Sequence, residues 1–237
     1  MKTYVVGDIH GNYEALKQCF ERSPFDKKED RLIILGDVVD GWPDTYKVVE
    51  ELLTVKNRVL LLGNHDEWFT WWVINGYKEP AWVQQGGMAT LESYNNDRKL
   101  AYAHYTRFYR DHVIYHFENN RKFIFVHGGF DWHKKIEGQD YKELIWDRHM
   151  YQTACYWTKR EPNNKFTGYD RIFIGHTTTE YSYAGCESTT TPKFMSNLIA
   201  MDTGAGYSGK LTIMNIDTLE YWQSDSASKL YPDVKGR

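Results

Sequence analysis

The stretch YVVGDIHGN, residues 4–12, places a carboxylate and an imidazole directly after a short apolar run. The run YVV is typical of a buried strand that ends at Gly7, and Asp8 and His10 then stand two residues apart. Side chains two apart in extended backbone point to the same side, so both can reach one ligand. A single Asp after a strand is commonly turn chemistry. The pattern gains weight because it returns four more times along the chain.

Five predicted strands end in a glycine beside a side chain that can bind a metal ion. These strand ends are GDIHG at 7–11, GDVVDG at 36–41, GNHD at 63–66, HGG at 127–129 and GHT at 175–177. In an open α/β sheet, ligands bind beyond the carboxyl ends of the strands. We therefore expect these ends to converge on one site. The side chains expected there are Asp8, His10, Asp37, Asn64, His127 and His176.

The expected ligands are imidazoles, carboxylates and an amide, with no thiolate. This mixture suits Mn, Fe or Zn better than Ca. Asp37 is the central carboxylate, and its two oxygens can bridge two cations. Two divalent ions roughly 3.5–4 Å apart form the clamp used for in-line phosphoryl displacement. The sequence therefore predicts a binuclear centre that attracts an anionic substrate and acidifies bound water.

The order of the predicted elements indicates an α/β protein. Strands are expected at 3–6, 31–35 and 58–62, with helices from an Asn12 cap to Ser23 and from Pro43 to Val55. The aromatic stretch 66–112 is interpreted as a helical, cap-like insertion. Later strands are expected at 113–117, 122–126, 171–174, 198–201 and 210–216, and the hairpin signal at 113–126 indicates a turn toward antiparallel sheet. The polar tail 224–237 is expected to fray.

Composition narrows the classes of function. Hydrophobic residues make up 41% and charged residues 26% of the 237 residues, which suits a single globular domain over 1–237. A net charge of −3 does not predict a basic surface of the kind that binds a nucleic-acid polymer. Three cysteines without C-x-x-C spacing do not predict a disulfide framework, and no apolar run approaches a membrane span. We expect a cytoplasmic protein with no membrane partner, and the sequence sets no oligomeric state.

The ordered set Asp-x-His, Gly-Asp-x-x-Asp, Gly-Asn-His-Asp, His and Gly-His-Thr resembles the calcineurin-like metallophosphoesterase superfamily. It is most similar to the phosphoprotein phosphatase branch, which includes bacterial and phage Ser/Thr phosphatases and symmetrical diadenosine tetraphosphatases. The resemblance runs from residue 3 to about 210. It implies a β-sandwich of two mixed sheets flanked by helices, and two divalent metal ions. Mn is expected first, with Fe, Zn, Ni or Mg as alternatives.

The resemblance also implies a division of the ligands between the two metals. The first metal takes Asp8 and His10, Asp37 bridges, and the second metal takes Asn64, His127 and His176.

The resemblance further implies catalytic roles for His65 and Asp40. A hydroxide that bridges the metals attacks the phosphorus, and His65, oriented by Asp40, protonates the leaving alkoxide as general acid. Asn64 also contacts the substrate. Asp66 is expected to cap the next helix rather than to react.

The sequence departs from the family at two positions that normally carry a phosphate-binding arginine. Gly41 follows Gly-Asp-x-x-Asp, and Leu62 precedes Gly-Asn-His. The segment LIWDRHM, residues 144–150, resembles the family segment that carries another such arginine, so Arg148 is the predicted phosphate-binding residue. The alternative for Arg148 is an exposed helix charge.

The tryptophans of the insertion have two interpretations. They could stack a nucleobase, but their helical spacing favours a place in the core. This cluster comprises Trp68, Trp71, Trp72 and Trp82.

Three functions stay open at this point. The first is hydrolysis of phosphomonoesters by a Ser/Thr protein phosphatase-like enzyme, and the alternative is hydrolysis of dinucleoside polyphosphates such as diadenosine tetraphosphate. The third is a non-catalytic scaffold, against which the intact ligand set argues. The expected partner is accordingly a phosphorylated protein, or a small phosphoester or nucleotide.

Overall fold

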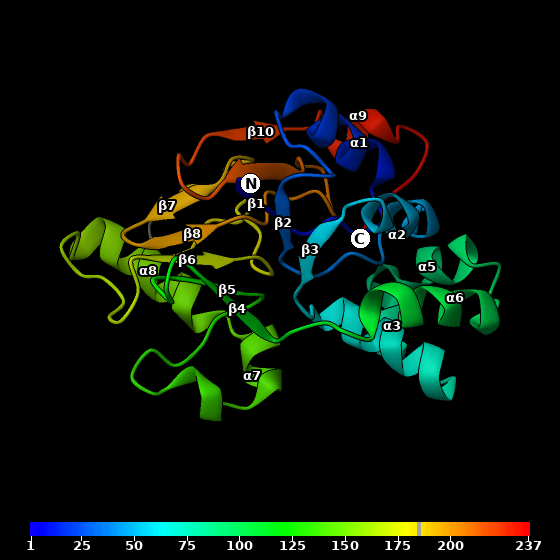
Figure 1. Ribbon diagram of the computed structural model, residues 1–237, viewed down its shortest axis with the longest axis horizontal. Helices are drawn as coiled ribbons and strands as arrows, with labels where there is room; N and C mark the ends of the chain where they lie inside the picture. Colours follow the sequence, from blue (N-terminus) through cyan, green and yellow to red (C-terminus); the bar gives the residue numbers. More distant parts are fainter. Residues whose placement is uncertain (184–185) are drawn as a thin grey trace.

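Two five-stranded sheets pack face to face in the computed structural model, and helices cover their outer faces (Figure 1). The structure describes residues 1–183 and 186–237. The first sheet has the order β10-β9-β1-β2-β3, and the second has the order β4-β5-β6-β8-β7. Both sheets are mixed: β1, β2 and β3 run parallel, as do β5, β6 and β8, whereas the pairs β10–β9, β9–β1, β4–β5 and β7–β8 are antiparallel. The predicted fold class is therefore confirmed.

Each sheet is built from short strands, and its central strands are buried. The first contains β1 (Thr3–Val6), β2 (Arg31–Ile34), β3 (Asn57–Leu60), β9 (Thr212–Asn215) and β10 (Tyr221–Gln223). The second contains β4 (Tyr115–Glu118), β5 (Phe123–Val126), β6 (Arg171–Ile174), β7 (Lys193–Met195) and β8 (Leu198–Ala200). The predicted hairpin is β4–β5, but β5, β6 and β8 are parallel, so the second half is less antiparallel than expected.

The apolar layer between the sheets fixes their relative position. Val5 and Ile33 of the first sheet pack in one buried cluster with Phe125 and Phe173 of the second. The rings of Phe125 and Phe173 stack with centroids 4.7 Å apart. Because side chains alternate across a strand, the opposite faces of the same strands are free to pack against helices. β1 and β2 are parallel, as are β5 and β6, so the loops that leave these strands emerge along one edge of the sandwich.

Two helices cover the first sheet near its parallel strands. α1 (Tyr13–Arg22) begins at Asn12, whose side chain accepts a hydrogen bond from the Ala15 N–H, and ends at Ser23, as predicted. α2 (Thr45–Leu53) begins after Asp44, so Pro43 precedes the helix and does not occupy its first turn. That boundary of the prediction was wrong.

The stretch 66–112 is helical, in agreement with the sequence. It contains α3 (Asn64–Asn75), α4 (Pro80–Trp82), a π-helical turn η1 (Val83–Gly87), α5 (Met88–Ser93), α6 (Arg98–His104) and a second π-helical turn η2 (Tyr105–Tyr109). Trp68, Trp72 and Trp82 are buried in the same core as β1 and β2, and Trp71 packs against it. The core interpretation of this tryptophan cluster is therefore correct.

The remaining helices lie beside the second sheet and at the end of the chain. They are η3 (Ile136–Gly138, a 3-10 turn), α7 (Tyr141–Trp146), α8 (His149–Arg160) and α9 (Ala227–Leu230). The polar tail was expected to fray, but it packs against the rest of the protein. Tyr231 stacks on Trp42 at 5.0 Å, and the Arg237 N–H donates to the Gly206 carbonyl at 2.9 Å.

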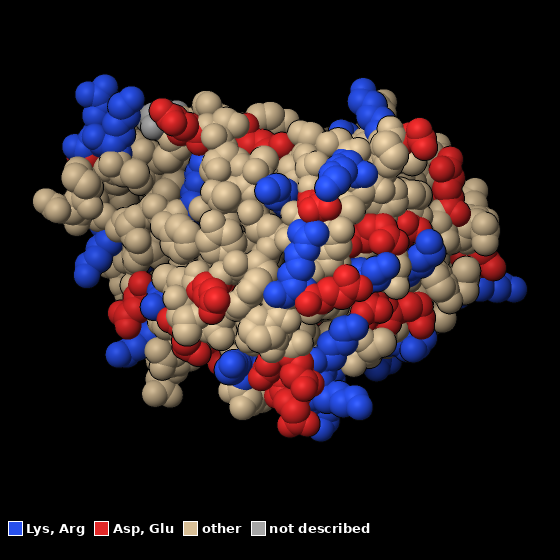
Figure 2. Space-filling model, turned by 90° about the horizontal axis from the view of Figure 1, so that it is seen from above, with Lys and Arg blue, Asp and Glu red and all other residues tan. Residues whose placement is uncertain are grey.

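Surface charges of both signs are interspersed over the face shown in Figure 2. Within the described part of the chain, no helix is both long enough and apolar enough to cross a membrane.

Candidate metal centre

Two groups of buried side chains meet where the loops leave β1, β2, β5 and β6. One group is Asp8, His10 and Asp37, and the other is Asp37, His127 and His176. Within each group the possible ligand atoms lie within 4.8 Å of one another. Asp37 belongs to both groups, which is the arrangement that the sequence predicts for a bridging carboxylate.

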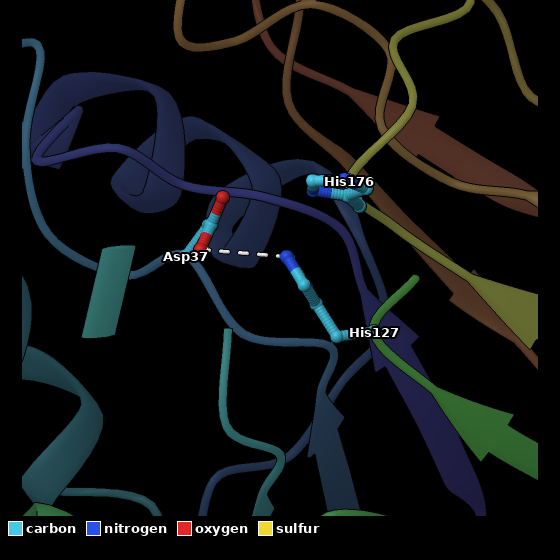
Figure 3. Close-up of side chains that lie close together, drawn as sticks. All are labelled: Asp37, His127 and His176. Atoms are coloured by element: carbon cyan, nitrogen blue, oxygen red, sulfur yellow. Dashed lines mark ion pairs between the residues drawn. The ribbon is translucent and has the colours of Figure 1, made fainter. Parts of the chain in front are cut away.

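The two oxygens of Asp37 face different histidines. Its Oδ1 lies 3.4 Å from His127 Nε2, and its Oδ2 lies 3.6 Å from His10 Nε2. Figure 3 shows the imidazole of His127 pointing at Asp37, with His176 approaching from the loop after β6. Asn64, the first residue of α3, completes this side of the centre, since its Oδ1 lies 3.1 Å from His127 Nε2. The structure thus brings all six predicted ligands together.

Backbone contacts hold the ligand side chains in place. His10 Nδ1 donates to the Val39 carbonyl at 3.0 Å, and His127 Nδ1 donates to the Leu35 carbonyl at 2.7 Å. Each bond keeps the proton on Nδ1 and turns Nε2 toward the centre, which is the nitrogen that can bind a metal. The His176 N–H donates to Asp8 Oδ2 at 2.9 Å, so the loops after β1 and β6 are joined at the site.

The backbone of the site is strained. Four of its residues, His10, Asp37, Asp40 and His176, have φ angles of 52°, 47°, 75° and 61°. Non-glycine residues rarely adopt this left-handed region, and such residues cluster at functional sites where the surrounding structure enforces them. Here these residues follow β1, β2 and β6 in the loops that form the centre.

Buried polar atoms without partners show that the centre fits cations. Asp8 Oδ1, Asp37 Oδ2 and His176 Nε2 are buried, and none has a hydrogen-bond partner among the described residues. An unpaired buried polar atom costs about 1–3 kcal/mol, so such atoms are rare in native proteins. Three of them converge from different loops, and all three belong to residue types that bind divalent metals. The donor set therefore suits two divalent ions.

The electrostatics of the centre lead to the same conclusion. Burial, together with the nearby Asp202 carboxylate, raises the pKa of Asp8 well above its usual range. Burial opposes ionisation of Asp37 as well, but His127 and His65 outweigh it and hold the pKa of Asp37 well below that range. For His127, burial is outweighed by Asp37 and Asp8, which raise its pKa to about 9. Crowded buried carboxylates are relieved when cations bind between them.

His65 and Asp40 form a second unit beside the ligands. His65 Nδ1 lies 2.6 Å from Asp40 Oδ2, and both side chains are fully buried. Trp82 Nε1–H donates to Asp40 Oδ2 at 2.7 Å, and the Thr90 hydroxyl donates to Oδ1 at 2.8 Å. The carboxylate that contacts His65 is therefore fixed by two side chains of the insertion.

The pKa shifts of this pair set where its protons lie. Burial raises the pKa of Asp40 well above its usual range and lowers the pKa of His65 to about 3. These shifts favour the neutral form of both partners, in which Asp40 Oδ2 donates its proton to Nδ1 and the imidazole proton lies on Nε2. His65 Nε2 is buried and has no partner in the described residues, so its N–H is free to donate to a group bound at the centre.

Asp66 and Arg148 occupy the places that the sequence suggests. Asp66 accepts from the N–H of Gly63, which precedes α3, at 3.1 Å, and from the Val38 N–H at 3.0 Å, so it caps the helix. The Arg148 guanidinium is half-buried and donates to the His176 carbonyl at 3.1 Å. Arg148 is therefore beside the metal ligands, and not on an exposed helix face.

Sequence reasoning missed three features of the site. Asp202 is buried near Asp8, and its position directly after the predicted strand 198–201 repeats the strand-end pattern, which is the signal that could have found it. The support of Asp40 by Trp82 and Thr90 has no local signal, because both lie more than forty positions away in sequence. Arg237, whose guanidinium donates to His10 Nε2 at 2.8 Å, also has none.

Solved structures share this fold at low sequence identity. One that is described provisionally as a diadenosine tetraphosphatase is 16% identical, with a TM-score of 0.65, and the match covers 94% of this chain and 92% of that one. A protein serine/threonine phosphatase from Saccharomyces cerevisiae is 15% identical, with a TM-score of 0.60 and coverage of 100% and 82%. At this level of identity, the similarity shows that these proteins share a fold with this chain.

Curated relatives match over a short stretch. The symmetrical bis(5'-nucleosyl)-tetraphosphatase of Buchnera aphidicola subsp. Acyrthosiphon pisum is 49% identical over 67 residues, which are 28% of this chain and 24% of that protein. The enzyme of the same name from Coxiella burnetii is 38% identical over 64 residues, 27% of this chain and 22% of that protein. The matched part thus spans about a quarter of the relatives' length.

A family model described as calcineurin-like phosphoesterase matches residues 1–180, a stretch that contains all six predicted metal ligands, His65 and Asp40. The predicted class, a metal-dependent phosphoric ester hydrolase, agrees with this match and with the donor set. Since the matched stretch covers most of the 237 residues, the chain belongs to the calcineurin-like phosphoesterase family.

Proposed function

We propose that this chain is a metal-dependent phosphoesterase whose substrates are dinucleoside polyphosphates, which it splits into two nucleotides. The observation that carries the phosphoesterase assignment is the pair of ligand groups that share Asp37. Two divalent ions held there would polarise a phosphoryl group and acidify a bound water. Asp8 and His10 would hold one ion, Asp37 both, and the remaining ligands the other.

The protein's own residues supply the proton for the leaving group. The neutral Asp40–His65 pair presents an N–H at Nε2, which suits donation to the oxygen that departs from phosphorus. The hydrogen bonds from Thr90 and Trp82 hold the Asp40 carboxylate against the imidazole of His65. Arg148, beside His176, would bind a phosphate oxygen from the other side of the centre.

Relatives favour a dinucleotide as the substrate. Both cited curated relatives are named as symmetrical tetraphosphatases, and this supports the dinucleotide alternative better than a Ser/Thr protein phosphatase. Trp146 provides an aromatic surface for a nucleobase beside the centre. The ring of Trp146, at the end of α7, is 39% exposed and meets His176 edge-on at 5.8 Å. Base–aromatic stacking on such a ring is worth about 1–3 kcal/mol.

The test is a substrate comparison with the Mn²⁺-loaded protein. Diadenosine tetraphosphate, a phosphopeptide and p-nitrophenyl phosphate would be assayed in parallel, with the products of the dinucleotide separated chromatographically. We expect the highest kcat/KM for the dinucleotide, and about a tenfold loss in Trp146→Ala, while Tyr156→Ala, which removes another exposed aromatic ring, has no effect. A phosphopeptide preferred over the dinucleotide would instead support the protein phosphatase, and no turnover of any substrate would support the scaffold.

A further inference from the structure

Arg237 reaches the centre from the far end of the sequence. In Figure 1 the segment after α9 turns back toward the middle of the molecule, where the C mark stands. The Arg237 guanidinium donates to His10 Nε2 at 2.8 Å and lies 4.0 Å from Asp37 Oδ2. Only 12% of the side chain is exposed. A cationic group from a segment outside the family match, which ends at residue 180, is thus part of the site.

Two glycines make room for the stem of this side chain. A Cβ at Gly41 would lie 3.3 Å from Arg237 Cγ, and a Cβ at Gly86 would lie 3.1 Å from the same atom. The two glycines are adjacent in space, since the Gly41 N–H donates to the Gly86 carbonyl at 3.1 Å. Gly41 is the position where the resembling family carries an arginine. Here the absence of a side chain at Gly41 leaves space for an arginine that comes from elsewhere.

The segment that carries Arg237 is anchored at several points. Tyr231 stacks on Trp42 at 5.0 Å, and its hydroxyl donates to Asp44 Oδ2 at 2.8 Å. The Arg237 N–H donates to the Gly206 carbonyl, and the guanidinium lies over the ring of Tyr207 at 5.1 Å. The position of the guanidinium is therefore set by packing on both sides of the side chain.

The contact with His10 identifies what this guanidinium can bind. His10 donates from Nδ1 to Val39, so Nε2 has a single lone pair, which serves either Arg237 or a metal ion. A metal bound to His10 would use this lone pair, and the guanidinium would then have its donors free for another acceptor. Its donors then face the edge of a centre that binds phosphate, and guanidinium pairs with phosphate through two parallel hydrogen bonds.

We propose that Arg237 is a phosphate-binding residue of this site, in place of the arginine that Gly41 lacks. The proposal rests on the function proposed above, because it assumes a phosphate at the metal centre. In this proposal Arg237 binds the phosphoryl group under attack, or the phosphoryl group next to it. The guanidinium would contact this group from the side of the centre where His10 lies. Arg148 lies beside His176, so the two guanidinium groups would hold the phosphates from two sides.

The experiment compares Arg237→Ala, Arg237→Lys and Lys235→Ala. Lys235→Ala is the matched control, because Lys235 is an exposed cation of the same segment and its removal changes the net charge equally. Calorimetry would measure the binding of inorganic phosphate to the Mn²⁺-loaded proteins and of Mn²⁺ to the metal-free proteins. Hydrolysis of diadenosine tetraphosphate would be followed in parallel, with thermal unfolding as a check that each variant folds.

We expect Arg237→Ala to weaken phosphate binding at least tenfold and to raise KM for the dinucleotide by a similar factor. Arg237→Lys should recover part of the loss, since it restores the charge but not the paired donors. Lys235→Ala should equal the wild type. Mn²⁺ affinity of Arg237→Ala should be unchanged or modestly higher.

Two results would overturn the proposal while leaving the proposed function intact. One is phosphate affinity in Arg237→Ala equal to that of Lys235→Ala, with the wild type active. The other is a large gain in Mn²⁺ affinity with unchanged phosphate affinity, which would make Arg237 a competitor of the first metal. If the wild type binds phosphate through Arg237 but does not hydrolyse the dinucleotide, the substrate assignment fails and the arginine's role stands. A wild type that binds no phosphate refutes both.

Discussion

The proton on His65 Nε2 is the residue-scale feature with the clearest kinetic consequence. We predict that His65→Asn keeps both metals but lowers kcat by about 10²–10⁴-fold on an alkyl phosphate, because general acid catalysis is lost. The loss should shrink for p-nitrophenyl phosphate, whose leaving group needs little protonation. Steady-state kinetics on the two esters, with metal content checked by elemental analysis, measure this.

His133→Asn is the control for His65→Asn, since His133 is an exposed histidine away from the ligand groups. Equal losses on the alkyl and aryl esters would show that His65 does not act as the proton donor.

The position of Arg148 leads to a second prediction at this scale. Its guanidinium donates to the His176 carbonyl and to the Thr177 hydroxyl, at 3.1 and 3.2 Å, so it is held beside the centre. We expect Arg148→Ala to lower kcat/KM on a small aryl phosphate by tenfold or more, because a charge-assisted contact with the phosphate is lost. The control is Arg160→Ala, which changes an exposed arginine at the end of α8, the helix that Arg148 precedes. A change of less than about threefold, under 1 kcal/mol, would make Arg148 a structural residue.

At the scale of elements, a buried histidine joins α6 to α2. His104 is 2% exposed, its Nε2 donates to Glu50 Oε1 at 2.7 Å, and the Tyr94 hydroxyl donates to its Nδ1 at 2.8 Å. Burial lowers the pKa of His104 below its ordinary value of 6.5. The unfolded chain therefore binds a proton at a higher pH than the folded protein does, and stability falls as the pH drops below about 6.5.

We predict that His104→Gln makes this pH dependence less steep between about pH 7 and pH 5, because glutamine does not titrate. Urea unfolding at several pH values, followed by tryptophan fluorescence, measures the free energy of unfolding of each protein. His133→Gln, an exposed site, should retain the slope of the wild type. A slope in His104→Gln as steep as in the wild type would show that other groups cause the acid sensitivity.

At the scale of the whole molecule, the metal centre joins loops of both sheets, so its occupation should stabilise the fold. Mn²⁺ at 100 times its dissociation constant adds about 2.7 kcal/mol if it binds only the folded state. For a chain of this size that corresponds to a rise in Tm of about 5–10 °C. We expect this rise on adding Mn²⁺ to the metal-free protein, and its reversal by a chelator, in differential scanning calorimetry.

Asp37→Asn should abolish most of that rise, because Asp37 belongs to both ligand groups. Asp111→Asn, which changes a carboxylate that is 86% exposed, should keep it. An unaltered rise in Asp37→Asn would contradict the shared role of this carboxylate.

Local sequence was sufficient to predict most of the central strands, the start of α1 and the side chains that meet at the candidate centre, because each signal there acts over a few residues. A β-branched run followed by Gly-Asp-x-His specifies a strand and the ligands at its end, and Asn12 specifies where α1 begins. The convergence of the strand ends follows from parallel pairing, so Asp8, Asp37 and His127 were predicted to meet although they lie far apart in the chain.

Contacts between distant segments decided the rest. No local pattern links Trp82 and Thr90 to Asp40, because their hydrogen bonds exist only after the insertion folds back over the centre. Arg237 shows the same limit most clearly. Its polar segment has the composition of a fraying tail, yet tertiary packing places its guanidinium on His10, 227 positions earlier, because Gly41 and Gly86 leave room for its stem. Sequence alone determined which side chains meet at the candidate metal centre, because they follow parallel strands, and the tertiary structure decided which charged groups from distant segments surround them.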